Sequence, residues 1–288
     1  MKARSLVLAG LAAAAGAIGW AAWFAPRRVV LRRRTLRLPR WPAELGGLRV
    51  AVLADLHAGA PHVDEDKVAR LVADINRVRP DLVALLGDYV DPKVVFGRPV
   101  SPEAVAAALG QLRAPLGIVA VLGNHDLAHA GARMRRCLRD TGVTLLENSA
   151  VAVCEGLWVA GVGPESKRRA NPEAAVAGVP AADAVLLLSH NPDAFVRVPE
   201  RVALTLSGHT HAGQVALPHL RARYIPSRFG ERFARGHVVE RGRHLFVSAG
   251  VGTSRFPIRF LAPPEIVLLR LEPGRRRETR SRHFRSAG

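Results

Sequence analysis

Cysteine is nearly absent from this sequence of 288 residues, which contains only Cys137 and Cys154. Two cysteines are too few for a disulfide-stapled small domain, and they exclude the zinc modules that rely on sets of cysteine ligands. Aromatic residues are also few, at 5% of the chain, and no aromatic stacking motif interleaves the basic residues at the two ends of the chain, as nucleic-acid binding would require. Internal repeats and low-complexity linkers are missing as well. The 49% of apolar residues is instead typical of a globular protein with a real hydrophobic core.

Acidic residues are outnumbered, with 24 Asp and Glu against 42 Lys and Arg, and the formal net charge is +18. An evenly spread excess of this size would indicate a nucleic-acid or anionic-membrane partner. The excess lies at the two ends, because residues 1–49 carry +9 and residues 270–288 carry +5. We therefore expect no specific nucleic-acid partner, and we keep a nuclease or other nucleic-acid-acting protein only as an alternative.

One long apolar run lies near the N-terminus, where the 21 residues from Ser5 to Ala25 include no charge. Its length, and the two tryptophans and the phenylalanine at its end, predict a membrane anchor within residues 1–26. A cleaved signal peptide and a buried helix are the alternatives, because Lys2 and Arg4 precede the run and small residues fill it. No pair of arginines precedes the run, which counts against twin-arginine export.

The segment after this run sets its predicted orientation. By the positive-inside rule, a cluster of positive charges marks the cytoplasmic side of a membrane span. Seven arginines follow the run closely, namely Arg27, Arg28, Arg32, Arg33, Arg34, Arg37 and Arg40. We therefore expect a protein of the inner (cytoplasmic) membrane, with a basic linker at residues 27–48 and the main domain in the cytoplasm. Export after signal cleavage is the alternative.

The remaining chain is expected to form one α/β domain over residues 49–272, followed by a basic tail at residues 273–288. Helical spacing predicts a helix behind an Asp64 cap, and Ser101-Pro102-Glu103 predicts the start of another. The predicted strands are 49–54, 82–86, 117–122, 157–161, 184–188, 203–206, 237–240, 245–248 and 266–271. Because the second half is poor in helices, we expect a mixed sheet or two packed sheets.

Polar residues with metal-binding chemistry directly follow five of these apolar runs. In chain order the motifs are Asp55-Leu56-His57, Gly87-Asp88, Gly123-Asn124-His125-Asp126, Ser189-His190 and Gly208-His209-Thr210-His211. Open α/β sheets place ligand sites at the carboxyl ends of their strands, so the five motifs can converge on one crevice. Each motif alone has an ordinary structural explanation, such as a turn or a satisfied core histidine. Their repeated position at strand ends argues against coincidence.

With His125 set aside, the motifs supply two carboxylates, one carboxamide and four imidazoles. Structural zinc takes four ligands, and catalytic zinc takes three and a water, so seven oxygen and nitrogen donors predict a dinuclear centre with a bridging carboxylate. The absence of thiolate ligands suits hard to borderline metals. We expect two divalent ions, with Mn²⁺ favoured and Fe, Zn²⁺ or Mg²⁺ as alternatives.

The five motifs, in this order, resemble those of the calcineurin-like metallophosphoesterase superfamily over residues 49–271. The resemblance implies an α/β fold, a calcineurin-like sandwich of two mixed β-sheets flanked by helices, here preceded by one N-terminal transmembrane helix. It also implies a set of ligands: Asp55, His57 and His211 for the first metal, Asn124, His190 and His209 for the second, and Asp88 as the bridge. It further implies that His125 is a non-ligand catalytic histidine that Asp126 positions.

These roles imply the hydrolysis of a phosphodiester or pyrophosphate bond. Two ions would lower the pKa of a bridging water and neutralise charge on the phosphoryl oxygens. His125 would donate a hydrogen bond to the phosphate or protonate the leaving group.

The later stretches 207–218 and 246–269 are similar to a bacterial subgroup of phosphodiesterases with an N-terminal membrane or export segment. Hydrolases of UDP-2,3-diacylglucosamine are related to this subgroup, so a UDP-sugar lipid is one substrate candidate. Ala212 stands where the subgroup usually has glycine. The aromatic and arginine-rich run from Tyr224 to Phe233 is a candidate lining for an apolar substrate groove, and an ordinary basic surface loop is the alternative. A non-catalytic metal-dependent scaffold is a further alternative.

Overall fold

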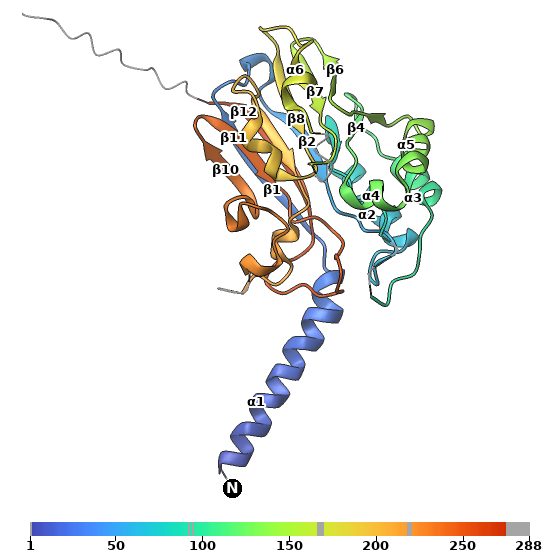
Figure 1. Ribbon diagram of the computed structural model, residues 1–288, viewed down its shortest axis with the longest axis vertical. Helices are drawn as coiled ribbons and strands as arrows, with labels where there is room; N and C mark the ends of the chain where they lie inside the picture. The colour runs from blue at the N-terminus through green and yellow to red at the C-terminus, as the bar shows by residue number, and fades with distance from the viewer. Residues whose placement is uncertain (1, 92, 94, 166–169, 218–220, 275–288) are drawn as a thin grey trace, which may run out of the picture.

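Two six-stranded sheets packed face to face form the centre of the computed structural model (Figure 1). The structure describes residues 2–274 except 92, 94, 166–169 and 218–220. Most of the expected basic tail, from residue 275 onward, therefore lies outside the described residues.

The first sheet has the strand order β1-β12-β2-β3-β4-β5. Its strands are β1 (Val30–Leu38), β12 (Glu265–Pro273), β2 (Leu48–Leu53), β3 (Leu82–Leu85), β4 (Ile118–Ala120) and β5 (Thr144–Leu145). All neighbouring pairs are parallel except β12 and β2. This sheet is therefore mixed, as expected.

The second sheet has the order β10-β11-β9-β8-β7-β6. Its strands are β10 (Gly236–Glu240), β11 (Arg243–Val247), β9 (Leu204–Ser207), β8 (Ala184–Leu188), β7 (Leu157–Gly161) and β6 (Ser149–Cys154). Only the outer pairs β10–β11 and β7–β6 are antiparallel. The predicted sandwich of two mixed sheets is thus confirmed.

Helices cover the outer face of each sheet. The helices are α2 (Glu65–Arg77), α3 (Pro102–Leu109), α4 (Asn124–His129), α5 (Gly131–Asp140) and α6 (Pro172–Val176). Short helical turns also occur at η3 (Ala43–Leu45), η5 (Pro192–Arg197), η6 (His211–Gly213), η7 (Arg221–Tyr224) and η8 (Gly230–Phe233). Both predicted helix starts are confirmed: Asp64 accepts a 2.8 Å bond from the backbone N–H of Lys67, and Ser101 accepts one of 3.1 Å from that of Ala104. These bonds satisfy N–H groups that a free helix end would leave without a partner.

Alternation along the strands divides the core into layers. On β2, Ala51 and Leu53 face α2, whereas Val50 and Val52 face the second sheet. Successive side chains of a strand point to opposite faces, so one strand serves two apolar layers. A third layer lies between the second sheet and α6, η5 and η8. The central strands are buried on both faces, and this packing holds their ends in place. The polar motifs begin at these ends.

Strand β1 corrects the expected basic linker at residues 27–48. Val30–Leu38 pairs in parallel with Glu265–Pro273 along its whole length. The side chain of Arg32 also forms an ion pair with buried Glu265. The folded body therefore begins near Val30, and not at residue 49. The pairing joins segments 235 residues apart, so no local pattern could predict it.

An apolar helix projects from the body at its lower end in Figure 1. It comprises α1 (Lys2–Gly19) and continues through η1 (Trp20–Phe24) and η2 (Ala25–Arg27). Residues 4–27 are long and apolar enough to cross a membrane, and among them only Ala21 and Pro26 are buried. Ala21, at the end that meets the body, is buried.

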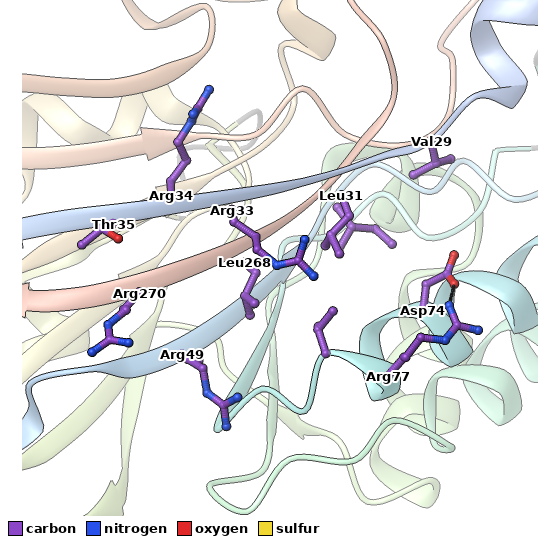
Figure 2. A pocket seen from close by; sticks show the side chains of 12 residues that line it. Val29, Leu31, Arg33, Arg34, Thr35, Arg49, Asp74, Arg77, Leu268 and Arg270 are labelled. Carbon is purple, nitrogen blue, oxygen red and sulfur yellow. Dashed lines mark hydrogen bonds and ion pairs between the residues drawn. The ribbon is translucent and has the colours of Figure 1, made fainter.

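The outer face of the first sheet is uncovered at the edge formed by β1 and β12. A cavity of about 690 Å³ lies there, between the sheet and the C-terminal end of α2. Figure 2 shows Arg33 pointing into this cavity beside Leu31, and Arg34 pointing away from it. None of the residues expected to bind metal lines the cavity. The candidate site is therefore located by its chemistry and not by the size of a pocket.

Candidate metal centre

The five motifs leave the carboxyl ends of β2, β3, β4, β8 and β9, and the structure brings them together. The backbone N–H of Asp55 donates to the carbonyl of Gly87, which links the first two motifs. The backbone N–H of His209 donates to the carboxylate of Asp55 at 2.9 Å, which joins the two sheets. The strand order places these ends side by side, so motifs that span 157 residues of sequence form one site.

One group of donors consists of Asp55, His57 and His211, whose candidate ligand atoms all lie within 4.8 Å of one another. The Nε2 atoms of His57 and His211 are 3.1 Å apart. All three side chains are buried. We call this set the first donor group.

A second donor group contains Asn124, His190 and His209. The Nε2 atom of His190 lies 3.1 Å from Oδ1 of Asn124 and 3.1 Å from Nδ1 of His209. A backbone carbonyl fixes the other ring nitrogen, because Nδ1 of His190 is 2.7 Å from the oxygen of Leu86. This partner orients Nε2 toward the other donors, as outer partners of metal-binding histidines commonly do.

Asp88 lies between the two groups. Its Oδ2 atom is 3.4 Å from Nε2 of His57 and 3.2 Å from Nε2 of His190. Atoms bound to one ion at about 2.0–2.2 Å are separated by roughly 3.0–3.4 Å, so these spacings suit shared coordination. The oxygen and nitrogen donors therefore fit a dinuclear divalent-metal site.

The charges of the site favour a bound cation. Burial lowers the pKa of His190, but the carboxylates of Asp88 and Asp55 outweigh burial and raise that pKa to about 9. Burial and the charge of His190 lower the pKa of His209 to about 3. Without metal, the buried carboxylates thus draw a proton onto His190, and an incoming cation would replace that positive charge.

The backbone of the site is held in an uncommon conformation. Five of the seven expected ligands have φ between +45° and +71°, namely Asp55, His57, Asp88, His209 and His211. This left-handed region is unfavourable for residues with a side chain and often marks functional sites. Ala212 has φ +53° as well, which explains why a glycine would suit its position.

Position 123 requires glycine because the backbone there lies very close to the Asp88 side chain. A Cβ atom on this residue would lie 2.0 Å from Oδ1 of Asp88, far inside van der Waals contact. The same Oδ1 accepts a 2.8 Å bond from the backbone N–H of His125. The glycine therefore allows the third motif to pack directly on the central carboxylate.

His125 lies beside the donor groups, and its ring is more accessible to solvent than the neighbouring ring of His57. Its side chain is 26% exposed, whereas that of His57 is fully buried. The two rings are 4.8 Å apart, edge to face. The exposed edge of His125 can therefore meet a molecule that enters the site.

The structure corrects the expected contact between Asp126 and His125. The Asp126 carboxylate accepts bonds of 2.7–2.8 Å from the backbone N–H groups of Asp88, Tyr89 and Gly123. Asp126 is the third residue of α4, and such a carboxylate folds back to cap the helix start. Its carboxylate therefore ties two metal-site loops together instead of contacting the neighbouring imidazole.

Asp91 makes the contact that was expected of Asp126. Its Oδ2 atom lies 2.9 Å from Nδ1 of His125 and 3.0 Å from Nδ1 of His57. The residue is buried. The sequence carries one signal for Asp91, a second carboxylate three residues after Asp88 in the same loop, and it was not among the predicted site residues.

Arg259 and the run 224–233 lie near the site. The guanidinium of Arg259 is fully buried and donates to the carbonyls of Ala249, Gly252 and Ala262, so its role is structural. Phe229 packs against buried Phe233 at a ring distance of 5.2 Å. Of the three aromatic side chains in the run 224–233, only that of Tyr224 is strongly exposed, so the three do not line a groove together.

Known proteins resemble the chain over the same region. The family model of the calcineurin-like phosphoesterases matches residues 48–213. An uncharacterized metallophosphoesterase of Bacillus subtilis, YkuE, is 28% identical over 270 residues, which cover 92% of this chain and 93% of that protein. An uncharacterized metallophosphoesterase of Aquifex aeolicus is 30% identical over 234 residues, which cover 78% of this chain and 85% of that protein.

A relative with a named activity also matches. The UDP-2,3-diacylglucosamine pyrophosphatase LpxG of Chlamydia trachomatis is 27% identical over 309 aligned positions, which cover 87% of this chain and 92% of that protein. The family match includes every motif of the two donor groups, because it extends from Leu48 to Gly213. The chain therefore belongs to the calcineurin-like phosphoesterase family and is a phosphoesterase hydrolase.

Proposed function

We propose that this chain hydrolyses a phosphodiester or pyrophosphate bond with water, on an amphiphilic substrate at a membrane surface. The observation that carries the reaction is the position of the Asp88 carboxylate between two donor groups, 3.4 Å from His57 and 3.2 Å from His190. In this proposal Asp55, His57 and His211 hold one ion, Asn124, His190 and His209 hold the other, and Asp88 bridges them.

Two divalent ions, when bound, supply a nucleophile from water and neutralise charge on the phosphoryl oxygens. The protein contributes the acid. His125 lies at the accessible edge of the site, where its Nε2 can donate to a phosphoryl oxygen or to the leaving group. Burial lowers the pKa of His125, but its contact with Asp91 and the charge of Asp88 outweigh burial and raise it. The raised pKa keeps the imidazole protonated to higher pH, which suits a group that donates a proton.

Asp91 acts as a positioning residue for His125. We expect Asp91→Asn to move the alkaline limb of the pH–rate profile to lower pH, because loss of the carboxylate lowers the pKa of His125 and a general acid must keep its proton. Measuring kcat between pH 6 and 10 at saturating metal checks this. Asp91 also contacts His57, so the metal content of the variant is measured in parallel. An unshifted alkaline limb at normal metal content would contradict the positioning role.

The proposed substrate class rests on the N-terminal helix and on the LpxG relative. The helix is long and apolar enough to span a bilayer, and the arginines after it predict a cytoplasmic catalytic domain. A tether of this kind raises the effective concentration of a substrate in the same membrane without new contacts. The name of the relative adds a UDP-sugar lipid as the first compound to test.

The deciding experiment uses the full chain in detergent, loaded with Mn²⁺, Fe²⁺, Zn²⁺ or Mg²⁺. We expect two metal ions per chain by elemental analysis. We also expect turnover of a bis-aryl phosphodiester and of UDP-2,3-diacylglucosamine at least about tenfold above that of aryl phosphomonoesters. Reaction in H₂¹⁸O should place the label in the phosphoryl product. Label in the alcohol product, or a preference for monoesters or soluble nucleotides, would overturn the proposal.

A further inference from the structure

The surface near the metal centre carries large apolar side chains that are exposed in the part of the chain that the structure describes. Apart from the N-terminal helix, six such residues are strongly exposed in the described part of the chain. Five of them lie on three loops, and Val239 is the sixth. The five are Val95 (42% exposed), Phe96 (87%), Tyr224 (57%), Phe256 (57%) and Leu261 (64%). Gathered apolar exposure of this kind marks an interaction surface.

Each loop is attached to a residue of the metal centre. The loop 91–98 starts at Asp91, which contacts the rings of His57 and His125. The loop 254–262 contains Arg259, whose guanidinium lies 3.4 Å from Nδ1 of His211. The helical turn η7, which begins the loop 221–229, contacts η6, and η6 begins at His211 of the metal centre. We call Phe96, Tyr224, Phe256 and Leu261 the apolar rim, because the loop of each adjoins a residue of the metal centre.

The end of the apolar helix joins the same loops. The carbonyl of Ala21 accepts a 2.9 Å bond from the backbone N–H of Arg259, and a ring nitrogen of His62 lies 2.8 Å from the carbonyl of Ala22. The N–H of Val95 in turn donates to the carbonyl of Arg255, which links two of the loops. Figure 1 shows the helix leaving the body at the end where the orange loops and the teal loop near residue 95 lie. The N-terminal helix and the loops of the rim therefore lie at the same end of the folded body.

Within the loops of the rim, the exposed charged side chains that the structure describes are basic. The segments 92–98, 214–229 and 250–262 include no Asp or Glu. Lys93, Arg98, Arg223 and Arg255 are exposed among them. Apolar tips flanked by basic residues are typical of surfaces that enter the interface of an anionic membrane. A surface for an ordinary protein partner would not need the end of an apolar helix beside it.

We propose that the apolar rim inserts into the bilayer that holds the N-terminal helix, so that the metal centre opens at the level of the lipid head groups. This inference rests on the proposed membrane anchor and extends the proposed function. An amphiphile would present its phosphate to the donors while its acyl chains remain among the lipids beside the rim. The protein then needs no deep pocket for the acyl chains. The N-terminal helix sets the distance between the metal centre and the membrane.

Depth-dependent fluorescence quenching tests the insertion. The full chain, with Cys137 and Cys154 replaced by serine, is reconstituted into vesicles of phosphatidylethanolamine and phosphatidylglycerol. Phe96→Cys and Phe256→Cys are each labelled with the fluorophore NBD, and Val239→Cys serves as the control because Val239 is 54% exposed on β10. We expect lipids with a spin label near the head group to quench both rim probes strongly and the control weakly. Equal quenching at all three positions would overturn the proposal.

Kinetics separate the rim from the reaction itself. We expect the double variant Phe96→Ser and Phe256→Ser to raise KM for a vesicle-borne phosphodiester by at least about fivefold. Its kcat on a soluble aryl phosphodiester should stay unchanged, because the rim contacts no donor. Equal losses of activity on the vesicle-borne and the soluble substrate would contradict the insertion of the rim. Quenching at the rim without hydrolysis of any ester would support the insertion and overturn the proposed function. Hydrolysis without quenching at the rim would overturn the insertion and support the proposed function.

Discussion

Asp88→Ala is expected to release both metal ions and to leave the protein folded. The Asp88 carboxylate lies within 3.4 Å of a ring nitrogen from each donor group, so its loss removes a ligand from each proposed ion. The loss of turnover should exceed the about 10- to 100-fold that changes to outer partners of a metal site cost. Elemental analysis, circular dichroism and the rate on an aryl phosphodiester measure these effects.

Two companions make the Asp88 result interpretable. Asp88→Asn keeps the volume of the side chain, so a folding defect confined to the alanine variant would be distinguished from loss of charge. Asp66→Ala, on the exposed face of α2, removes a carboxylate far from the donors and should retain metal and activity. Near-normal metal content in both Asp88 variants would disprove the bridge.

His125→Asn is expected to keep both ions and to lower kcat by about 10² to 10⁴. The imidazole lies at the accessible edge of the site, and the structure offers seven other donors for the two ions. A group that acts on the substrate in the transition state lowers kcat and kcat/KM together when it is removed. Steady-state kinetics at saturating metal, with elemental analysis of the same sample, measure this outcome.

The competing possibility is that His125 is itself a ligand, because one of its ring nitrogens lies within 4.8 Å of candidate ligand atoms of His57 and Asp88. In that case the variant would lose metal along with activity. His237→Asn is the matched control, since it removes an imidazole on β10 and should change neither quantity. Unchanged turnover of His125→Asn would show that the ring takes no part in the reaction.

The local pattern of the sequence determined most of the strands and the chemistry that follows them. Runs such as 82–86 and 184–188 became β3 and β8, because a short apolar segment buried on both faces can only be a central strand or a buried helix. The residues after them had the donor types of a metal site. Strand β1 was missed, since four of its nine residues are arginines and its stability comes from pairing with β12 at the other end of the chain.

The sequence by itself therefore determined the fold class, the family and the residue types that gather at the strand ends. Only the tertiary structure decided which carboxylate contacts which histidine ring. Asp126 is adjacent to His125 in the chain, yet helix geometry turns its carboxylate back to the backbone of Asp88 and Gly123. Asp91 reaches His125 across 34 residues because two loops meet at neighbouring strand ends. The apolar rim has the same origin, because three loops distant in sequence share a face only after both sheets have formed.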